Sequence, residues 1–302
     1  MEKQKILIVG NGKIGQAIFH LLRSSKIHKN LDIEVYDKDP IKNRSEKTLI
    51  DCARNANFIF LCIPSWAEEE ALLEMKMVLD KHTTLITLSK GINVSAKKSM
   101  DELLEKDAKD SKYALLSGPM FAFEIIENKK SYAVLASKNK KIYENIAKLF
   151  SGTNLRLEYE KDVHSVAISA VLKNVYTIIF GMIESYGEKK NTRGFLASVA
   201  IKEMRSIMKT LKLNEKIIDG TAGMADFIAT SESEHSQNRK LGKEIFETGK
   251  ATFKSEGLVS ISSLFKMLGK NSSRFPLLSL IEKILIGKKN AKKEIEKFLN
   301  KI

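Results

Sequence analysis

The stretch Lys5–Leu22 constrains the fold of this chain more than any other. A short apolar run, Ile6–Val9, ends at three glycines in Gly-x-Gly-x-x-Gly spacing, and apolar residues at helical spacing follow them. This pattern predicts a strand, a tight turn and a helix. In such a turn the first glycine reverses the chain, the second lets a diphosphate approach the backbone, and the third lets helix and strand pack closely. The three glycines are Gly10, Gly12 and Gly15.

An acidic residue at the end of the next expected strand supports a dinucleotide site. The strand Ile33–Tyr36 ends at Asp37, roughly 20 residues after the last glycine, where a carboxylate can accept hydrogen bonds from the adenosine ribose. The alternative is a glycine turn in some other α/β protein, with Asp37 as an ordinary loop residue.

Strand and helix signals alternate up to about residue 160, and helices alone follow Asp162. The further strands and extended segments expected are Phe58–Ile63, Thr84–Leu88, Tyr113–Leu116, Ser131–Ala136 and Leu155–Glu158. This order predicts an α/β fold, with an N-terminal Rossmann-type doubly wound sheet followed by an all-helical C-terminal domain. We expect a dinucleotide-binding domain over residues 1–160 and a helical substrate and catalytic domain over residues 161–302.

Amphipathic or apolar periodicity predicts the helices. They are Trp66–Asp80, Tyr143–Phe150, Val163–Tyr186, Phe195–Leu211, Asn238–Glu247, Val259–Leu268, Pro276–Leu285 and Ala291–Leu299. The acidic run Glu68, Glu69 and Glu70 is interpreted as the solvated face of the helix Trp66–Asp80, which has a structural role. The long apolar helix is interrupted by His164, Lys173 and Asn174, which favours a buried helix over a membrane span.

Composition bounds the partners. The 302 residues are 43% hydrophobic and 29% charged, an ordinary globular balance, and the net charge of +14 favours anionic ligands. The lysines are scattered and no nucleic-acid recognition motif accompanies them, so we expect no nucleic-acid partner. The two cysteines and five histidines lack metal-ligand spacing, and no metal is expected. Because the first residues lack a signal-peptide pattern, we expect a cytoplasmic protein without an integral membrane span.

Three polar groups in the second half can carry chemistry. Lys173 lies within an apolar helix, so it either lines a site, where burial and neighbouring charges adapt it to proton transfer, or is an ion-paired or snorkelling lysine. Asp226 ends a glycine-containing loop and could orient a lysine; the alternative is that this loop is only a capped turn between two helices. Ser236 opens a helix together with Gln237 and Asn238, an arrangement suited to a phosphate, although helix capping by Ser236 is the commoner occurrence.

An ordered series of segments resembles one family over essentially the whole chain. These segments are Gly10–Gly15, Ile63–Ser65, Ser89–Ile92, Ser117–Pro119 with Phe121 and Ala122, Leu172–Val175, Asn191–Arg193, Gly223–Asp226, Asn238–Arg239 with Gly242, and Glu256–Gly257. In this order they resemble the bacterial NAD(P)-dependent glycerol-3-phosphate dehydrogenases. Three positions depart from the family pattern: Lys13 stands where a small residue is frequent, Met120 replaces a small hydroxyl residue, and Gln237 replaces an arginine.

The resemblance implies roles for particular residues. Lys173 would donate or accept the proton, with Lys90 and Asp226 as further catalytic residues. The substrate would lie among Lys90, Gly118, Asn174, Thr230, Ser236, Gln237 and Asn238. The dinucleotide would lie along Gly10, Gly12, Lys13, Ile14, Gly15, Asp37, Pro64, Lys90, Ala122, Gln237 and Glu256.

The expected reaction is hydride transfer between a nicotinamide and dihydroxyacetone phosphate to give sn-glycerol 3-phosphate, which in the family feeds phospholipid synthesis. NAD is the expected cofactor and NADP is left open. The expected partner is a small phosphate substrate, and a homodimer is left open. Two alternatives remain: a related dehydrogenase of another small hydroxy or keto substrate, and a dinucleotide-binding protein without catalysis.

Overall fold

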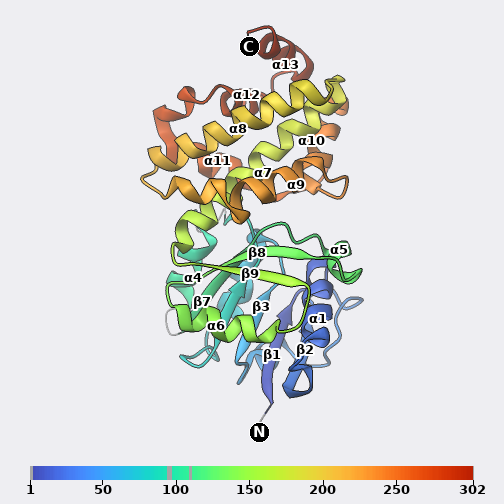
Figure 1. The fold of residues 1–302 in the computed structure, drawn as a ribbon, viewed down its shortest axis with the longest axis vertical. Helices are drawn as coiled ribbons and strands as arrows, with labels where there is room; N and C mark the ends of the chain where they lie inside the picture. The colour runs from blue at the N-terminus through green and yellow to red at the C-terminus, as the bar shows by residue number, and fades with distance from the viewer. Residues whose placement is uncertain (1–2, 94–96, 109–110, 302) are drawn as a thin grey trace. The chain divides into compact units, whose positions relative to one another are not determined.

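The computed structural model describes residues 3–93, 97–108 and 111–301 of the chain, which form two compact units. The first, residues 1–167, is an α/β unit, and the second, residues 168–302, is built of helices (Figure 1). The predicted fold class is therefore confirmed.

Seven strands of the described chain form one sheet in the α/β unit. Their order across the sheet is β2, β1, β3, β4, β7, β8, β9, and all neighbours pair in parallel except β7 with β8. The bounds are β1 Gln4–Val9, β2 Leu31–Tyr36, β3 Phe58–Leu61, β4 Thr84–Thr87, β7 Lys112–Ser117, β8 Ser131–Ala136 and β9 Leu155–Glu160. A separate short pair, β5 Ile92–Asn93 and β6 Lys98–Ser99, is antiparallel. Because β1, β3, β4 and β7 are parallel, the loops that follow them meet at one edge of the sheet.

The pairing register sorts strand residues onto two buried faces. Ile8 is level with Val35 and with Phe60, and these side chains belong to the apolar cluster that packs against α1, α5 and α6. One position further along, Val9 is level with Leu61, and Leu61 is level with Thr87. Since side chains alternate along a strand, this second row faces the other side of the sheet.

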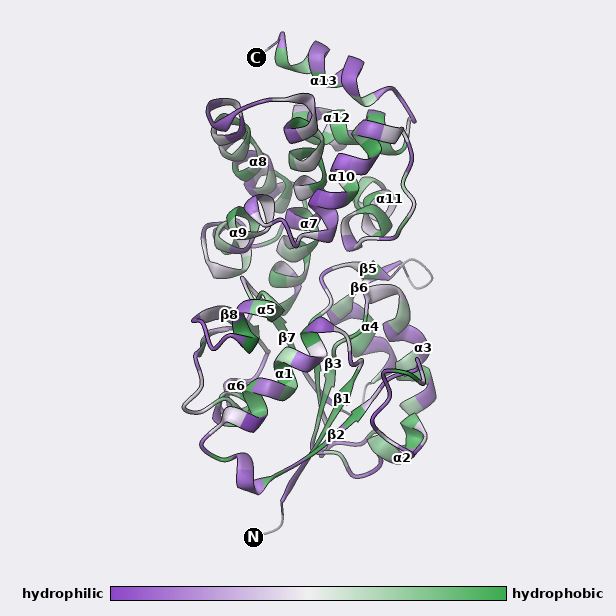
Figure 2. Cartoon of the chain, turned by 90° about the vertical axis from the view of Figure 1, so that its right-hand side faces the viewer, coloured by the Kyte–Doolittle hydropathy of each residue, from purple (hydrophilic) through white to green (hydrophobic). Residues whose placement is uncertain are grey.

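Helices flank the sheet on both faces (Figure 2). Their bounds are α1 Lys13–Ser24, α2 Leu49–Ala53, α3 Ser65–Met75, α4 Met100–Asp107, α5 Ala122–Ile126 and α6 Lys140–Leu149. The helix predicted over Trp66–Asp80 is shorter than expected, because after Met75 the chain turns toward β4. Asp80 stabilises this turn by accepting hydrogen bonds from the backbone N–H groups of His82 and Thr83.

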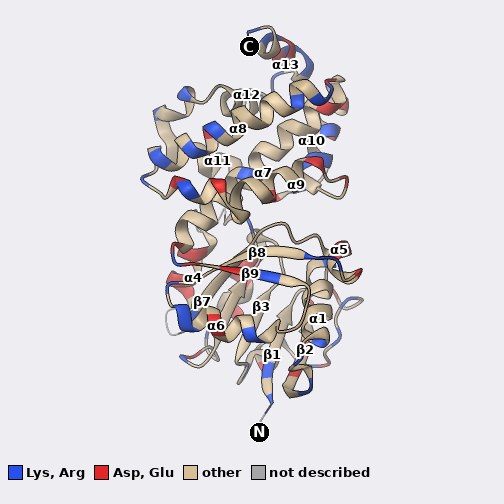
Figure 3. Ribbon diagram, in the orientation of Figure 1, with Lys and Arg blue, Asp and Glu red and all other residues tan. Residues whose placement is uncertain are grey.

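The second unit consists of helices. They are the main part of α7 Val163–Tyr186, then α8 Lys190–Thr210, α9 Asp226–Glu232, α10 Gln237–Thr248, α11 Glu256–Leu268, α12 Pro276–Leu285 and α13 Ala291–Leu299, with short turns at Glu215–Asp219, Thr221–Ala225 and Gly269–Arg274. α7 is long and apolar enough to cross a membrane, but its apolar window is 100% buried within the protein. The prediction of a buried helix is confirmed. Lys and Arg residues occur throughout both units (Figure 3).

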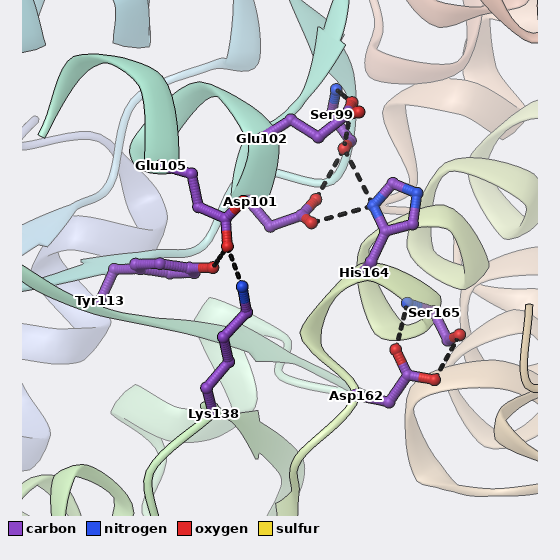
Figure 4. Close-up of polar contacts among 9 residues, drawn as sticks. All are labelled: Ser99, Asp101, Glu102, Glu105, Tyr113, Lys138, Asp162, His164 and Ser165. Atoms are coloured by element: carbon purple, nitrogen blue, oxygen red, sulfur yellow. Dashed lines mark hydrogen bonds and ion pairs between the residues drawn. The ribbon is translucent and has the colours of Figure 1, made fainter. Parts of the chain in front are cut away.

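Polar contacts anchor the start of α7 in the α/β unit (Figure 4). Asp162 caps the helix by accepting hydrogen bonds from the backbone N–H and the hydroxyl of Ser165. His164 Nδ1 lies 2.9 Å from Asp101 Oδ2 on α4, and Ser99 Oγ lies 2.6 Å from Asp101 Oδ1. The hydrogen bond to Asp101 raises the pKa of His164 against the opposing effect of burial. Burial favours a higher pKa for Asp101, but its bonds to His164 and Ser99 outweigh this and lower it.

Candidate functional site

The glycine-rich turn between β1 and α1 leaves open space where a diphosphate would lie. Gly10 has a φ of +99°, and a Cβ there would lie 2.7 Å from the carbonyl oxygen of Cys62. A Cβ on Gly15 would lie 1.9 Å from the oxygen of Gly10, so the helix can approach the strand only with glycine at this position. A Cβ on Gly12 would meet no heavy atom within 4 Å, and Gly12 is the N-cap residue of α1 without a side-chain cap. The turn therefore fits an anion at the helix N-terminus.

A pocket of about 160 Å³ lies beside this turn, at the end of β2. Asp37 lines it and also braces the turn, because Asp37 Oδ2 accepts the N–H of Asn11 at 2.7 Å. Lys38, Glu70 and Glu74 line the same pocket, and Lys38 Nζ lies 2.6 Å from Glu70 Oε1. The pocket can take the adenosine ribose, and its carboxylates disfavour an additional phosphate there.

Lys90 lies at the same sheet edge, in the loop after β4. Its Nζ donates to the carbonyl oxygen of Gly118, at 2.9 Å, in the loop after β7. The structure therefore brings together two residues expected around the substrate. Of the other positions expected along the dinucleotide in this unit, Lys13 and Ile14 form the first turn of α1, Pro64 is the N-cap residue of α3, and Ala122 begins α5.

Glu68 was expected to face solvent, and this prediction is wrong. Its side chain is fully buried, and its Oε1 accepts hydrogen bonds from Thr87 and Ser89. Of the same acidic run, Glu70 is exposed and pairs with Lys38. The sequence did not reveal the buried Glu68 because three adjacent acids on a helix point in different directions, and the sequence does not show which one faces the sheet. The available signal was the presence of two hydroxyl residues, Thr87 and Ser89, on the neighbouring strand end.

In the helical unit, Lys173 is buried beside two side chains of α9. Its Nζ donates to Thr230 Oγ1 at 3.0 Å and lies 3.4 Å from Asp226 Oδ1. Thr230 in turn donates to Asp226 Oδ1 at 3.2 Å. Lys173 is 4% exposed and Asp226 2% exposed, so the attraction between them acts with little screening by water. The arrangement holds an ammonium group in a defined position, as a proton donor requires.

Two asparagines continue this cluster. Asn238 Nδ2 donates to Asn174 Oδ1 at 2.9 Å, and Asn238 Oδ1 accepts the N–H of Gly257 at 3.0 Å. Close approach of α10 to α7 makes the first contact possible, because a Cβ on Gly242 would lie 1.9 Å from the carbonyl oxygen of Ile178. The structure thus brings together Lys173, Asp226 and Thr230 in one contact group and Asn174 and Asn238 in another, with Lys173 and Asn174 adjacent on α7.

The start of α10 departs from a simple phosphate site. Ser236 Oγ accepts the N–H of Arg239, so Ser236 caps the helix. Gln237 is exposed, whereas Arg239 is buried and its Nε lies 2.7 Å from Glu184 Oε2. Arg239 is therefore held by Glu184 and points to a different face from Gln237. Glu256, expected along the dinucleotide, begins α11 beside Gly257.

Met120, another departure from the family pattern, packs against the apolar cluster that covers the α1 face of the sheet. An apolar side chain is therefore stabilised at a position where the family usually has a small hydroxyl residue.

Comparison with known proteins identifies the family. The family models for the N-terminus and C-terminus of NAD-dependent glycerol-3-phosphate dehydrogenase match residues 38–143 and 162–296. Glycerol-3-phosphate dehydrogenase (NAD(P)+) of Clostridium botulinum is 26% identical over 323 aligned positions, covering 98% of this chain and 97% of that protein. The enzyme of the same name from Pseudomonas aeruginosa is 30% identical over 270, covering 82% and 77%. The glycerol-3-phosphate dehydrogenase structure from Coxiella burnetii has the same fold, with a TM-score of 0.87 at 20% identity over 98% of this chain and 99% of that one. The chain therefore belongs to the NAD(P)-dependent glycerol-3-phosphate dehydrogenase family.

Proposed function

We propose that this protein catalyses the NAD(P)H-dependent reduction of dihydroxyacetone phosphate to sn-glycerol 3-phosphate. Membership of the family supports the reaction, and the observation that carries the assignment to this chain is the buried Lys173 held by Thr230 and Asp226. Burial of a charge within an apolar helix is costly, and this cost supports a catalytic role for Lys173.

In this proposal Lys173 protonates the carbonyl oxygen of the substrate as it becomes an alcohol. Asp226 and Thr230 hold the lysine Nζ in place. Lys90 stabilises the negative charge that develops on the substrate, as a preorganised cation can do at low cost. Asn174 and Asn238, together with Ser236 and Gln237 at the start of α10, bind the remainder of the phosphorylated substrate.

The glycine turn and the pocket beside it are proposed to bind the dinucleotide. When bound, the nicotinamide supplies a hydride to the substrate carbonyl carbon. The open space at Gly12 and the N-terminus of α1 receive the diphosphate, and Asp37 accepts hydrogen bonds from the ribose. Lys13, Ile14, Pro64 and Ala122 border this path. A cytoplasmic location is part of the proposal, and the two buried cysteines, which form no disulfide, fit a reducing compartment.

The test is a steady-state assay of the purified protein with dihydroxyacetone phosphate, followed by the absorbance of NADH and, separately, of NADPH. Formation of glycerol 3-phosphate in step with loss of NADH supports the proposal. A panel of unphosphorylated hydroxy and keto acids serves as the comparison. Turnover of a panel member without turnover of the phosphate would reassign the substrate, and binding of NADH without any turnover would indicate a non-catalytic protein.

A further inference from the structure

A buried acid lies next to the loop that carries Lys90. Glu68, on the sheet-facing side of α3, is 0% exposed. Its Oε1 accepts a hydrogen bond from Thr87 Oγ1 at 2.5 Å and a shorter one from Ser89 Oγ. Thr87 is the last residue of β4, and Ser89 lies in the loop that follows, directly before Lys90.

The end of β4 and the loop after β3 bring these groups together. Thr87 is level with Leu61 and Leu115, in the row that faces away from α1. The strand ends there, and the N–H of Ser89 folds back to donate to Thr87 Oγ1 at 3.2 Å. Ser89 Oγ also lies 2.7 Å from the carbonyl oxygen of Ile63, in the loop after β3. Glu68 therefore connects α3 with the end of β4, and Ser89 extends this contact to the loop after β3.

We propose that Glu68 is a positioning residue for Lys90, an inference that rests on the proposed function. By holding both hydroxyl groups, Glu68 determines where the backbone turns at Ser89 and so where the side chain of Lys90 begins. The far end of that side chain is held by Gly118 at 2.9 Å. The lysine is thus fixed at both ends, which preorganises its charge for the transition state.

Packing alone does not require an acid at this position. Neighbouring buried positions of α3 are Ala71, Leu72 and Met75, and a further apolar residue would cover the sheet without the cost of burying a carboxyl group. The hydrogen bonds to Thr87 and Ser89 offset that cost. They also hold the two residues in place just before Lys90.

The experiment is a double-mutant cycle on Glu68 and Lys90 with dihydroxyacetone phosphate and NADH. Glu68→Leu removes the acceptor, Glu68→Gln retains an acceptor oxygen without the charge, and Lys90→Ala removes the positioned group. Glu69→Gln, one residue along the same helix, is the matched control. Thermal unfolding of each variant monitors the fold.

We expect Glu68→Leu to lower kcat/KM for dihydroxyacetone phosphate by about 10- to 100-fold, the effect of losing a hydrogen bond to a charged group. Glu68→Gln should stay within about threefold of the parent, and Glu69→Gln should match it. Because Glu68 acts through Lys90, Glu68→Leu should add less than about twofold in the Lys90→Ala background.

The positioning role would be overturned if the losses in kcat/KM caused by Glu68→Leu and Lys90→Ala multiply in the double variant. Full activity of a folded Glu68→Leu protein would overturn it as well. If Glu68→Leu does not fold, Ser89→Ala removes the same contact from the donor side, and its cycle with Lys90→Ala decides the question by the same criterion. Absence of activity in the parent protein would instead refute the proposed function, so the two failures are distinguishable.

Discussion

Replacement of Lys173 by methionine separates its chemical role from its structural one. Methionine keeps an unbranched chain in the apolar helix but removes the ammonium group. At an Nζ–Oδ1 distance of 3.4 Å, the attraction to Asp226 is about 5 kcal/mol for an effective dielectric constant of ~20, before the cost of desolvation. Removing one member of a buried pair typically destabilises a protein by about 3–5 kcal/mol, because the other charge stays buried. At roughly 2–4 °C per kcal/mol, the unfolding midpoint should fall by roughly 6–20 °C.

Turnover should fall by at least about 10²- to 10⁴-fold, the usual contribution of a general acid. The double variant Lys173→Met with Asp226→Asn removes the unpaired charge, while the introduced amide can still accept a hydrogen bond from Thr230. The double variant should therefore recover most of the loss in unfolding midpoint without recovering turnover. NADH binding, measured by fluorescence titration, should change little in either variant, because the glycine turn lies in the other unit.

The experiment therefore measures kcat, the unfolding midpoint and NADH affinity for the parent, the single variant and the double variant. Recovery of turnover together with the midpoint in the double variant would show that Lys173 is a structural residue. A single variant as stable as the parent would refute the reasoning about the buried pair.

Three further outcomes are expected. The parent protein should prefer NADH over NADPH, and a parent that prefers NADPH would contradict this prediction. Glu70→Gln removes the partner of Lys38 and should raise the relative kcat/KM for NADPH. The increase should be at most about fivefold, because the Lys38–Glu70 pair is exposed. Gln237→Arg should lower the KM for dihydroxyacetone phosphate by about tenfold if one charged hydrogen bond of ~1.5 kcal/mol is gained, and an unchanged KM would exclude Gln237 from the phosphate site. The raised pKa of His164 gives stability that is complete below the unfolded value of about 6.5 and is lost as pH rises through the folded pKa. The unfolding midpoint should thus fall with pH more in the parent than in His164→Asn, and parallel profiles would contradict the pairing with Asp101.

Local signals in the sequence determined the elements whose ends depend on nearby residues. The predicted bounds of Val163–Tyr186, Pro276–Leu285 and Ala291–Leu299 are those of α7, α12 and α13. Pro276 begins its helix with a fixed φ, and Asn290 caps the next by accepting the N–H of Lys293. The glycine spacing was equally informative, because the turn itself leaves no room for a Cβ at Gly10 or Gly15.

Contacts between distant segments decided the rest, because a repeating pattern gives the spacing of buried positions but not what lies opposite them. Only the packing of α3 on the sheet shows that Glu68, rather than Glu70, meets the end of β4. Only the close crossing of α7 and α10 shows that Asn238 reaches Asn174. The polar partners of Lys173 come from α9, and Thr230 is 57 residues away in the chain. The partners of Lys173 are therefore set by the packing of the helices and not by the sequence around Lys173.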